Sequence, residues 1–258
     1  MPFAEAGTTR IYYENHGAGP PVVFLHGAGG NHAAWWQQVA FFRSTYRVIT
    51  VDLRGFGKSD GVAEGPDSLD FPEDIKAVFD HAAITQGTLV GQSIGAVAAL
   101  RFAVSQPTRV KAIIMAHSLG AISDPQLSPL VSSDRAEAEK LPVLDRLLTK
   151  AFQQSEPART FLFQQLGTFN EATMRDLRNV SAAGPKLEEV AKLGLKLYFL
   201  AGESDAVLRP PTIRAAHERL PGSVLTIVPG APHSMYWERP DLFNASVNQF
   251  LKQIHGGS

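Results

Sequence analysis

Short runs of apolar residues alternate along the chain with longer stretches in which apolar residues recur at helical spacing. Largely apolar runs of this length are typical of strands that are covered on both faces. We predict such strands at residues 22–25, 47–52, 87–90, 110–116, 196–202 and 223–228. We predict a more polar strand, suited to the edge of the sheet, at residues 9–15. We predict helices at residues 35–42, 72–83 and 94–105, from about residue 211, and at 240–254. This alternation predicts an α/β fold with a mostly parallel central sheet flanked by helices.

The alternation is interrupted between residues 119 and 193. This block has an amphipathic helical pattern without a strong strand, and prolines divide it into short pieces. A helical block of this size within an α/β alternation indicates an inserted unit. We therefore predict a core of residues 1–118 and 194–258 and an inserted helical cap of residues 119–193.

Ser93 stands between the predicted strand at 87–90 and the predicted helix at 94–105, with Gly91 and Gly95 two positions away on either side. The glycines leave room for strand and helix to approach each other. The turn between them points the serine hydroxyl and the free N–H groups of the helix N-terminus at the same place. This is the G-x-S-x-G pattern of a nucleophile elbow, and it makes Ser93 the candidate nucleophile.

The same pattern occurs a second time, at residues 57–61 around Ser59. The residues that follow, 61–67, include the glycines, proline and acidic residues of a loop, which do not suit a buried helix. We therefore predict that Ser59 lies in a tight turn and is not a nucleophile.

Two candidate partners for Ser93 directly follow predicted strands, where ligands bind in a parallel sheet. They are Asp205 and His233, and the resulting chain order is serine, acid, histidine. A serine needs a base to become nucleophilic, and the base needs a carboxylate to fix its tautomer. Glu203 is the alternative acid, but Asp205 is preferred because it stands three residues after Gly202 at the strand end.

Several segments in this order resemble the motifs of the α/β-hydrolases, specifically the capped serine hydrolases of carboxylesterase or lactonase type. They are HGAGG at 26–30, DLRGFGKS at 52–59, GQSIG at 91–95, GESD at 202–205, GAPH at 230–233 and WERPDLFN at 237–244. The resemblance covers essentially the whole chain. It implies the α/β-hydrolase fold and a Ser–His–Asp triad of Ser93, His233 and Asp205. It also implies an oxyanion hole formed by the backbone N–H groups of Ala28 and Ile94.

Three other polar residues at strand ends have structural interpretations. The resemblance implies that His26 braces the turn that shapes the oxyanion hole. Asp52 and Arg54 are expected to form an ion pair, because no cluster of histidines and carboxylates has the spacing of a metal site. We therefore predict no metal and no cofactor.

The predicted cap is rich in aromatic residues, which indicates an apolar substrate pocket. The candidate pocket residues are Trp35, His117, Phe152, Phe161 and Phe163. His117 follows the strand after the elbow, so lining the pocket and packing in the core are equally open for it. Aromatic residues at helical spacing also serve packing alone.

Composition restricts the partners. The 258 residues carry a net charge of −1 and include no cysteine, which excludes disulfides, thiolate metal sites and a cysteine nucleophile. The near-neutral charge indicates neither nucleic acid nor a membrane surface as a partner. We expect a cytoplasmic monomer or homodimer acting on a small-molecule ester substrate, since the first residues lack the pattern of a signal peptide.

The function predicted from these residues is hydrolysis of carboxylic esters, or lactones, of short to medium apolar acids through an acyl-enzyme. One alternative is a carbon–carbon bond hydrolase of aromatic degradation, which uses the same triad. Another alternative, of a different class, is a non-catalytic ligand-binding receptor on the same fold. Relatives that open epoxides or remove halogens require aspartate at the elbow, and Ser93 excludes them.

Overall fold

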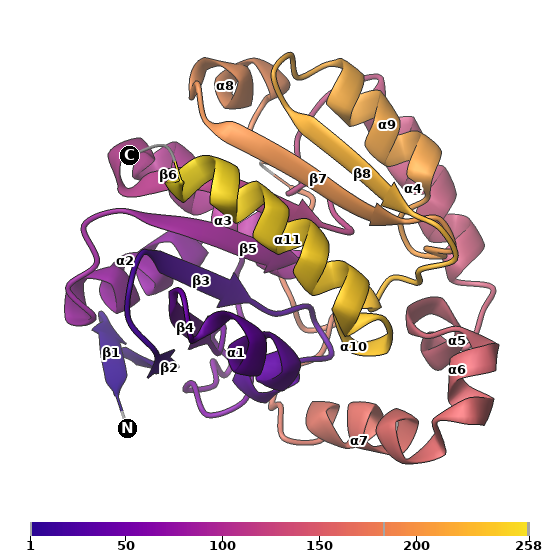
Figure 1. Ribbon diagram of the computed structural model, residues 1–258, viewed down its shortest axis with the longest axis horizontal. Coiled ribbons are helices and arrows are strands. Elements are labelled where there is room, and N and C mark those ends of the chain that lie inside the picture. The colour runs from indigo at the N-terminus through magenta and orange to yellow at the C-terminus, as the bar shows by residue number, and fades with distance from the viewer. Residues whose placement is uncertain (1, 183, 257–258) are drawn as a thin grey trace.

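The computed structural model describes residues 2–182 and 184–256, and within them eight strands form a single sheet (Figure 1). The strands are β1 (Phe3–Ala6), β2 (Thr9–His16), β3 (Pro21–Leu25), β4 (Arg47–Val51), β5 (Gly87–Gln92), β6 (Val110–Ala116), β7 (Lys196–Gly202) and β8 (Val224–Val228). Their order across the sheet is β1-β2-β4-β3-β5-β6-β7-β8. Only β2 runs against its neighbours, β1 and β4, and the other pairs are parallel. The predicted mostly parallel sheet is confirmed. The strand predicted at 9–15 is β2, but it does not lie at the edge, because β1, which the sequence pattern did not reveal, pairs with its outer side.

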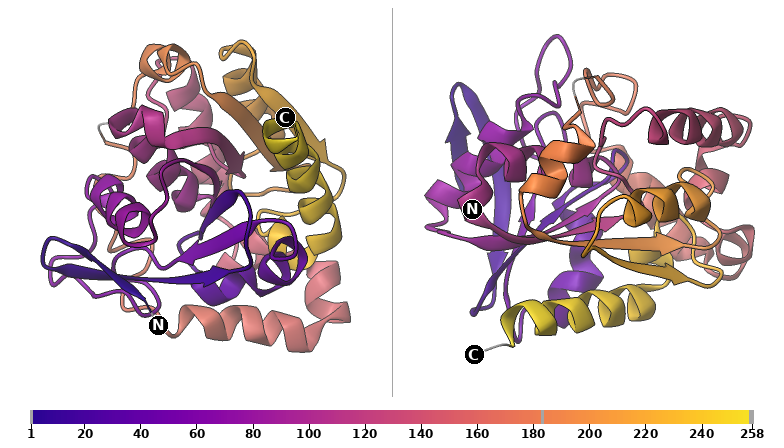
Figure 2. Two further views of the ribbon diagram at one scale, coloured as in Figure 1. Left: turned by 60° about the vertical axis from the view of Figure 1, so that its left-hand side comes forward. Right: turned by 90° about the horizontal axis from the view of Figure 1, so that it is seen from above.

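Helices cover both faces of the sheet (Figure 2). They are η1 (His32–Trp35), α1 (Trp36–Phe42), α2 (Phe71–His81), α3 (Ile94–Ser105), η2 (Pro107–Arg109), α9 (Pro210–Glu218), α10 (Met235–Glu238) and α11 (Pro240–His255). Successive side chains of a strand point to opposite faces, so each central strand contributes to two cores. In β3, Val23 and Leu25 join the core that includes α2, α3 and α9. Val22 and Phe24 join the core that includes α1, α10 and α11.

The segment between β6 and β7 contains five further helices in its described residues. They are α4 (Leu127–Ala138), α5 (Val143–Leu147), α6 (Lys150–Ser155), α7 (Pro157–Gly167) and α8 (Leu187–Lys192). Helix α4 packs beside α9 of the core: the buried Asp134 accepts hydrogen bonds from the N–H of Arg209 (2.9 Å) and the hydroxyl of Thr212 (2.7 Å). The inserted block is thus divided between the core and the region of α5–α7.

Helices α5–α7 lie at the end of the sheet toward which β7 and β8 point (Figure 1). The N–H of Ser234 donates to the carbonyl of Leu147 (2.9 Å), and the carboxylate of Glu238 accepts from the N–H and hydroxyl of Thr149 (2.9 and 2.7 Å). These contacts fix the junction of α5 and α6 on the segment that follows β8. No helix in the described part of the chain is long and apolar enough to cross a membrane.

Candidate active site

The candidate nucleophile Ser93 occupies the sharp turn between β5 and α3. Its backbone angles are φ 52° and ψ −114°, a conformation that residues with a side chain avoid. A Cβ at Gly91 would lie 2.4 Å from the amide nitrogen of Ala96. A Cβ at Gly95 would lie 2.0 Å from the carbonyl oxygen of Leu25. Both positions therefore require glycine, and the strand–turn–helix geometry is that of a nucleophile elbow.

The glycine-rich loop after β3 lies directly against this turn. A Cβ at Gly27 would lie 2.0 Å from Oε1 of Gln92 and 3.4 Å from Cβ of Ser93, so a side chain at this position would displace the amide of Gln92. The next residue, Ala28, is partly exposed, and its N–H has no hydrogen-bond partner in the described part of the chain. The N–H of Ile94, at the first position of α3, also has no partner among the described residues. Neither of the two donors that we predict for an oxyanion hole is therefore taken up by another group of the described residues.

A buried histidine holds this loop in shape. Nδ1 of His26 lies 2.7 Å from the carbonyl oxygen of Gly27, and Nε2 lies 3.1 Å from the amide nitrogen of Leu53. The carbonyl only accepts and the amide only donates, so the ring proton must be on Nδ1. Burial lowers the pKa of His26, which keeps this tautomer neutral. His26 therefore joins the loop after β3 to the loop after β4.

Asp205 follows β7 and is bonded to His233, which follows β8. Nδ1 of His233 lies 2.9 and 3.0 Å from the two carboxylate oxygens. Oδ1 of Asp205 also accepts from the N–H groups of Val207 (2.8 Å) and Leu208 (3.0 Å). Burial opposes ionisation, but the charge of His233 and the hydrogen bonds to the carboxylate hold the pKa of Asp205 well below its usual range. Asp205 is therefore an ionised acceptor that orients the imidazole.

His233 is tied to the nucleophile turn through the backbone. The side-chain amide of Gln92, the residue before Ser93, donates to the carbonyl oxygen of His233 (3.2 Å). The loops that carry the acid and the histidine also touch, because a Cβ at Gly202 would lie 2.1 Å from the carbonyl oxygen of Ala231. The fold thus brings the ends of β5, β7 and β8 together.

The alternative acid, Glu203, points elsewhere. It is exposed, and its carboxylate accepts the N–H of Gly230 (2.9 Å). Its partner is thus the backbone of the loop, whereas His233 is bonded to Asp205. The geometry favours Asp205 as the acid.

His117, at the end of β6, lies in the same buried cluster. Its Nδ1 is 2.9 Å from Oδ2 of Asp205, and its ring packs edge-on against that of His233 with centroids 5.6 Å apart. The sequence placed His117 among the pocket candidates without indicating this contact. Only the pairing of β6 with β7 makes the contact visible, since the two residues are 88 positions apart.

The aromatic pocket candidates lie in different environments. Trp35 is fully buried and packs against Phe24 in the core, so it does not line an open pocket. Phe152 is also buried in that core, whereas 63% of the surface of Phe161 is exposed. Phe163 is partly buried, and its ring meets that of Trp237 edge-on with centroids 5.5 Å apart.

The expected ion pair between Asp52 and Arg54 is not present. The guanidinium of Arg54 is bonded to Asp74 (2.5 and 2.7 Å) and Asp70 (2.6 Å), both at the start of α2. Asp52 instead accepts from Nδ1 of His32 (2.8 Å) and from backbone N–H groups of the surrounding loops. Successive side chains leave this loop in different directions, so sequence proximity was misleading.

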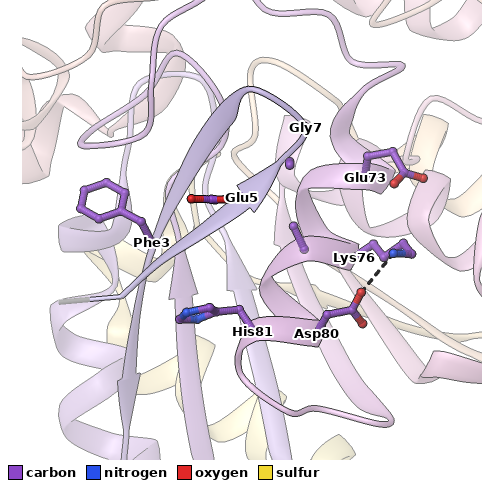
Figure 3. A pocket seen from close by; sticks show the side chains of 9 residues that line it. Phe3, Glu5, Gly7, Glu73, Lys76, Asp80 and His81 are labelled. Carbon is purple, nitrogen blue, oxygen red and sulfur yellow. Dashed lines mark hydrogen bonds and ion pairs between the residues drawn. The ribbon is translucent and has the colours of Figure 1, made fainter.

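Within the described residues, a metal ion could be held by His117, Asp205 and His233, whose donor atoms lie within 4.8 Å of one another. The distances from Nδ1 of His117 and from Nδ1 of His233 to the Asp205 carboxylate are both 2.9 Å, which is typical of hydrogen bonds. A hollow of about 480 Å³ lies elsewhere, between β1 and α2 (Figure 3). Its lining combines charged residues, including Glu73, Lys76 and Asp80, with small and apolar ones such as Phe3, and it contains none of the candidate triad.

A sheet of this strand order, with a strained serine after β5, an acid after β7 and a histidine after β8, defines an α/β-hydrolase. The chain belongs to the alpha/beta hydrolase family, whose model matches residues 22–246.

The names of individual relatives refer to different activities. A protein of Synechocystis sp. whose name refers to a non-heme chloroperoxidase is 30% identical over 98% of this chain and 100% of its own length. The 3-oxoadipate enol-lactonase 2 of Acinetobacter baylyi is 26% identical over 92% of this chain and 90% of its own. The solved structure of a thermophilic esterase from Thermogutta terrifontis has a TM-score of 0.82, with 22% identity and coverage of 96% and 94% of the two chains. Esterases, lactonases, a peroxidase and carbon–carbon bond hydrolases are thus all among the similar proteins.

Proposed function

We propose that the protein is a serine hydrolase that cleaves carboxylic esters or lactones through an acyl-enzyme. The observation that carries this proposal is the bond between Asp205 and Nδ1 of His233, which leaves Nε2 of that ring to act as the base. The same loop is bonded through Gln92 to the turn that presents Ser93. These three residues are the proposed triad.

In the first half of the reaction, Oγ of Ser93 attacks the carbonyl carbon while Nε2 of His233 takes its proton. The negative charge that develops on the carbonyl oxygen is stabilised by the N–H groups of Ala28 and Ile94. The carbon–oxygen bond then breaks, and His233 returns the proton to the leaving alcohol. The acyl group remains on Ser93.

In the second half, water replaces the alcohol as nucleophile. His233 takes a proton from water, the hydroxide adds to the acyl carbon, and the acid leaves as Ser93 recovers its proton. Asp205 remains ionised throughout and stabilises the imidazolium in both halves. The mechanism uses no metal ion or cofactor, so activity should survive treatment with a chelator.

We propose that α5–α7 form a cap that limits the size of the substrate. Trp237 Nε1 donates to the carbonyl of Arg159 (3.2 Å), and Arg159 in turn donates to the carbonyl of Trp237. Together with the contacts of Ser234 and Glu238, these bonds hold the cap over the segment that follows His233. Leu148, Phe152 and Leu166 of the cap are buried in the apolar core there, and this packing fixes the cap in place. A cap fixed in this way would admit a short to medium apolar acyl group.

A substrate panel tests this proposal. It consists of p-nitrophenyl esters from acetate to palmitate, several lactones and a vinylogous diketone from aromatic ring cleavage, each assayed with the unaltered protein and with Ser93→Ala. We expect hydrolysis of the shorter esters or of lactones that is lost in Ser93→Ala. Palmitate cleaved faster than butyrate would contradict the small pocket.

The same panel separates the competing functions. Rapid cleavage of the diketone with negligible ester hydrolysis would assign the protein to the carbon–carbon bond hydrolases. No turnover of any compound above the Ser93→Ala background, together with specific ligand binding, would support a receptor.

A further inference from the structure

A second imidazole, that of His117, is bonded to the Asp205 carboxylate beside the imidazole of His233. His117 directly follows β6. Its N–H donates to the carbonyl of Leu200 in β7 (2.8 Å), and its side chain is fully buried. Its Nδ1 lies 2.9 Å from Oδ2, the same oxygen that Nδ1 of His233 approaches to 2.9 Å. Three elements, the ends of β6, β7 and β8, thus meet at one carboxylate.

The protonation of His117 follows from what surrounds it. An ionised carboxylate only accepts hydrogen bonds, so Nδ1 of His117 must carry a proton. Burial lowers the pKa of His117, against the opposing effect of Asp205, and the ring is therefore neutral. Nε2 is then a bare lone pair, and this atom is buried without a hydrogen-bond partner among the described residues. The ring is satisfied only on the side that faces Asp205, which indicates that this contact is its role.

We propose that His117 is a positioning residue for the acyl-transfer reaction: its Nδ1–H fixes the Asp205 carboxylate and takes up part of the charge that would otherwise act on His233. The inference rests on the proposed function. A carboxylate that also accepts a hydrogen bond from His117 attracts the imidazolium of His233 less strongly, and therefore stabilises that imidazolium less. With His117 in place, His233 gives up its proton at lower pH and is a free base over a wider range around neutrality.

Other charged groups near the cluster have partners of their own. Glu203, after β7, accepts the N–H of Gly230. Arg209, at the start of α9, lies 3.8 Å from Asp134 in α4, and Glu238 in α10 is bonded to Thr149. The side chains that interact with the Asp205 carboxylate are the two imidazoles. A change in the pH dependence on altering His117 can therefore be assigned to this contact.

The backbone at this position decides which variants are informative. His117 has φ 56°, a conformation that asparagine and glycine accept more readily than leucine. Asparagine also places an amide N–H where the imidazole has Nδ1, so His117→Asn keeps the donor. His117→Leu fills the space without a donor, and His117→Gly removes the side chain without straining the backbone.

The test measures the rate at which a serine-directed phosphonate labels Ser93, as a function of pH, in the unaltered protein and the three variants. We expect the acid limb of the profile to move up by about one pH unit in His117→Leu and His117→Gly, which is about a tenfold loss of rate at low pH. His117→Asn should keep the original limb. Equal acid limbs in all four proteins would overturn the proposal, as would a loss in His117→Asn as large as that in His117→Leu.

Thermal unfolding of each variant shows whether it is folded. If neither donor-free variant folds, nitrogen NMR of labelled histidine in the unaltered protein decides. A His117 ring that stays neutral and protonated on Nδ1 while His233 titrates supports the proposal, and a His117 ring that titrates together with His233 overturns it.

Labelling also keeps this test separate from the proposed function, because it needs no substrate. Ser93 that is labelled in a protein without esterase or lactonase activity contradicts the ester proposal and leaves the result for His117 readable. If Ser93 of the unaltered protein is not labelled at all, the assignment of the nucleophile fails, and the NMR titration decides the role of His117.

Discussion

The chain contains two serines within the same five-residue pattern, and the fold treats them in opposite ways. Ser93 is partly exposed in a strained turn between a central strand and a buried helix. Ser59 is buried, and its hydroxyl donates to the carbonyl of Asp52 (2.6 Å) and accepts the N–H of Tyr12 (2.9 Å). Both functions of the Ser59 hydroxyl are thus used to join β2 to the loop after β4. A serine can act as a nucleophile only if its hydroxyl is not used in structural hydrogen bonds, and the five-residue pattern does not show whether it is.

The largest difference between the two serines should appear on removing Ser93. We expect Ser93→Ala to lower kcat by on the order of 10⁴–10⁶-fold, because no other group in the site can form the acyl-enzyme. Alanine should leave the fold intact, so the melting temperature should not fall. Steady-state kinetics and thermal unfolding measure both quantities. Near-normal turnover by Ser93→Ala would reverse the roles assigned to the two serines.

The second prediction concerns the acid of the proposed triad, for which Ser59 has no counterpart. Asp205→Asn should lower kcat by on the order of 10³–10⁴-fold, because an amide cannot stabilise the imidazolium of His233. Glu203→Gln is the matched control, since that carboxylate is exposed and bonded to the backbone of Gly230, and it should change kcat by less than about twofold. An inactive Glu203→Gln beside an active Asp205→Asn would show that Glu203 is the acid.

The third prediction uses pH. The rate should fall as the pH drops to the acid side of neutrality, because the imidazole that acts as base must be unprotonated to accept the proton of Ser93. Stability should decline in the same range, because burial lowers the pKa values of His26 and His117 in the folded protein. The unfolded chain then binds protons that the folded one does not, so the free energy of unfolding falls as pH drops below ~6.5.

Below pH ~4 the carboxylate of Asp205 adds to this loss. Its pKa is depressed in the folded protein, so its contribution is present above its unfolded value and disappears as pH falls toward the folded one. Denaturant unfolding at a series of pH values measures the effect. A free energy of unfolding that is constant from pH 7 to pH 4 would contradict the assignment of buried neutral histidines.

The smallest effect on activity is expected at Ser59. Ser59→Ala leaves the N–H of Tyr12 and the carbonyl of Asp52 without their partner, which should lower the free energy of unfolding by about 1–3 kcal/mol. Turnover should remain within about twofold of the original, because neither group touches the site. Peptide mapping after phosphonate treatment provides the control: label on the Ser59 peptide would contradict the comparison.

Local sequence was sufficient for the elements and for the fold class. The largely apolar runs predicted the six parallel strands of the described sheet, because a strand covered on both faces is built mostly from apolar residues. It also separated the two serines, since the residues after Ser93 can form a buried helix and those after Ser59 cannot. The short β1, which pairs only at the edge, has no comparable pattern and was missed.

Contacts between distant loops were decided by the tertiary structure alone. Arg54 is bonded to α2 although Asp52 is two residues away, and Trp35 enters the core although it follows the oxyanion loop. His117 joins Asp205 because β6 and β7 lie side by side in the sheet. Side-chain direction depends on how strands pair and twist, and spacing along the chain does not contain that information. Composition and pattern therefore determined which groups this protein possesses, and packing determined which of them meet.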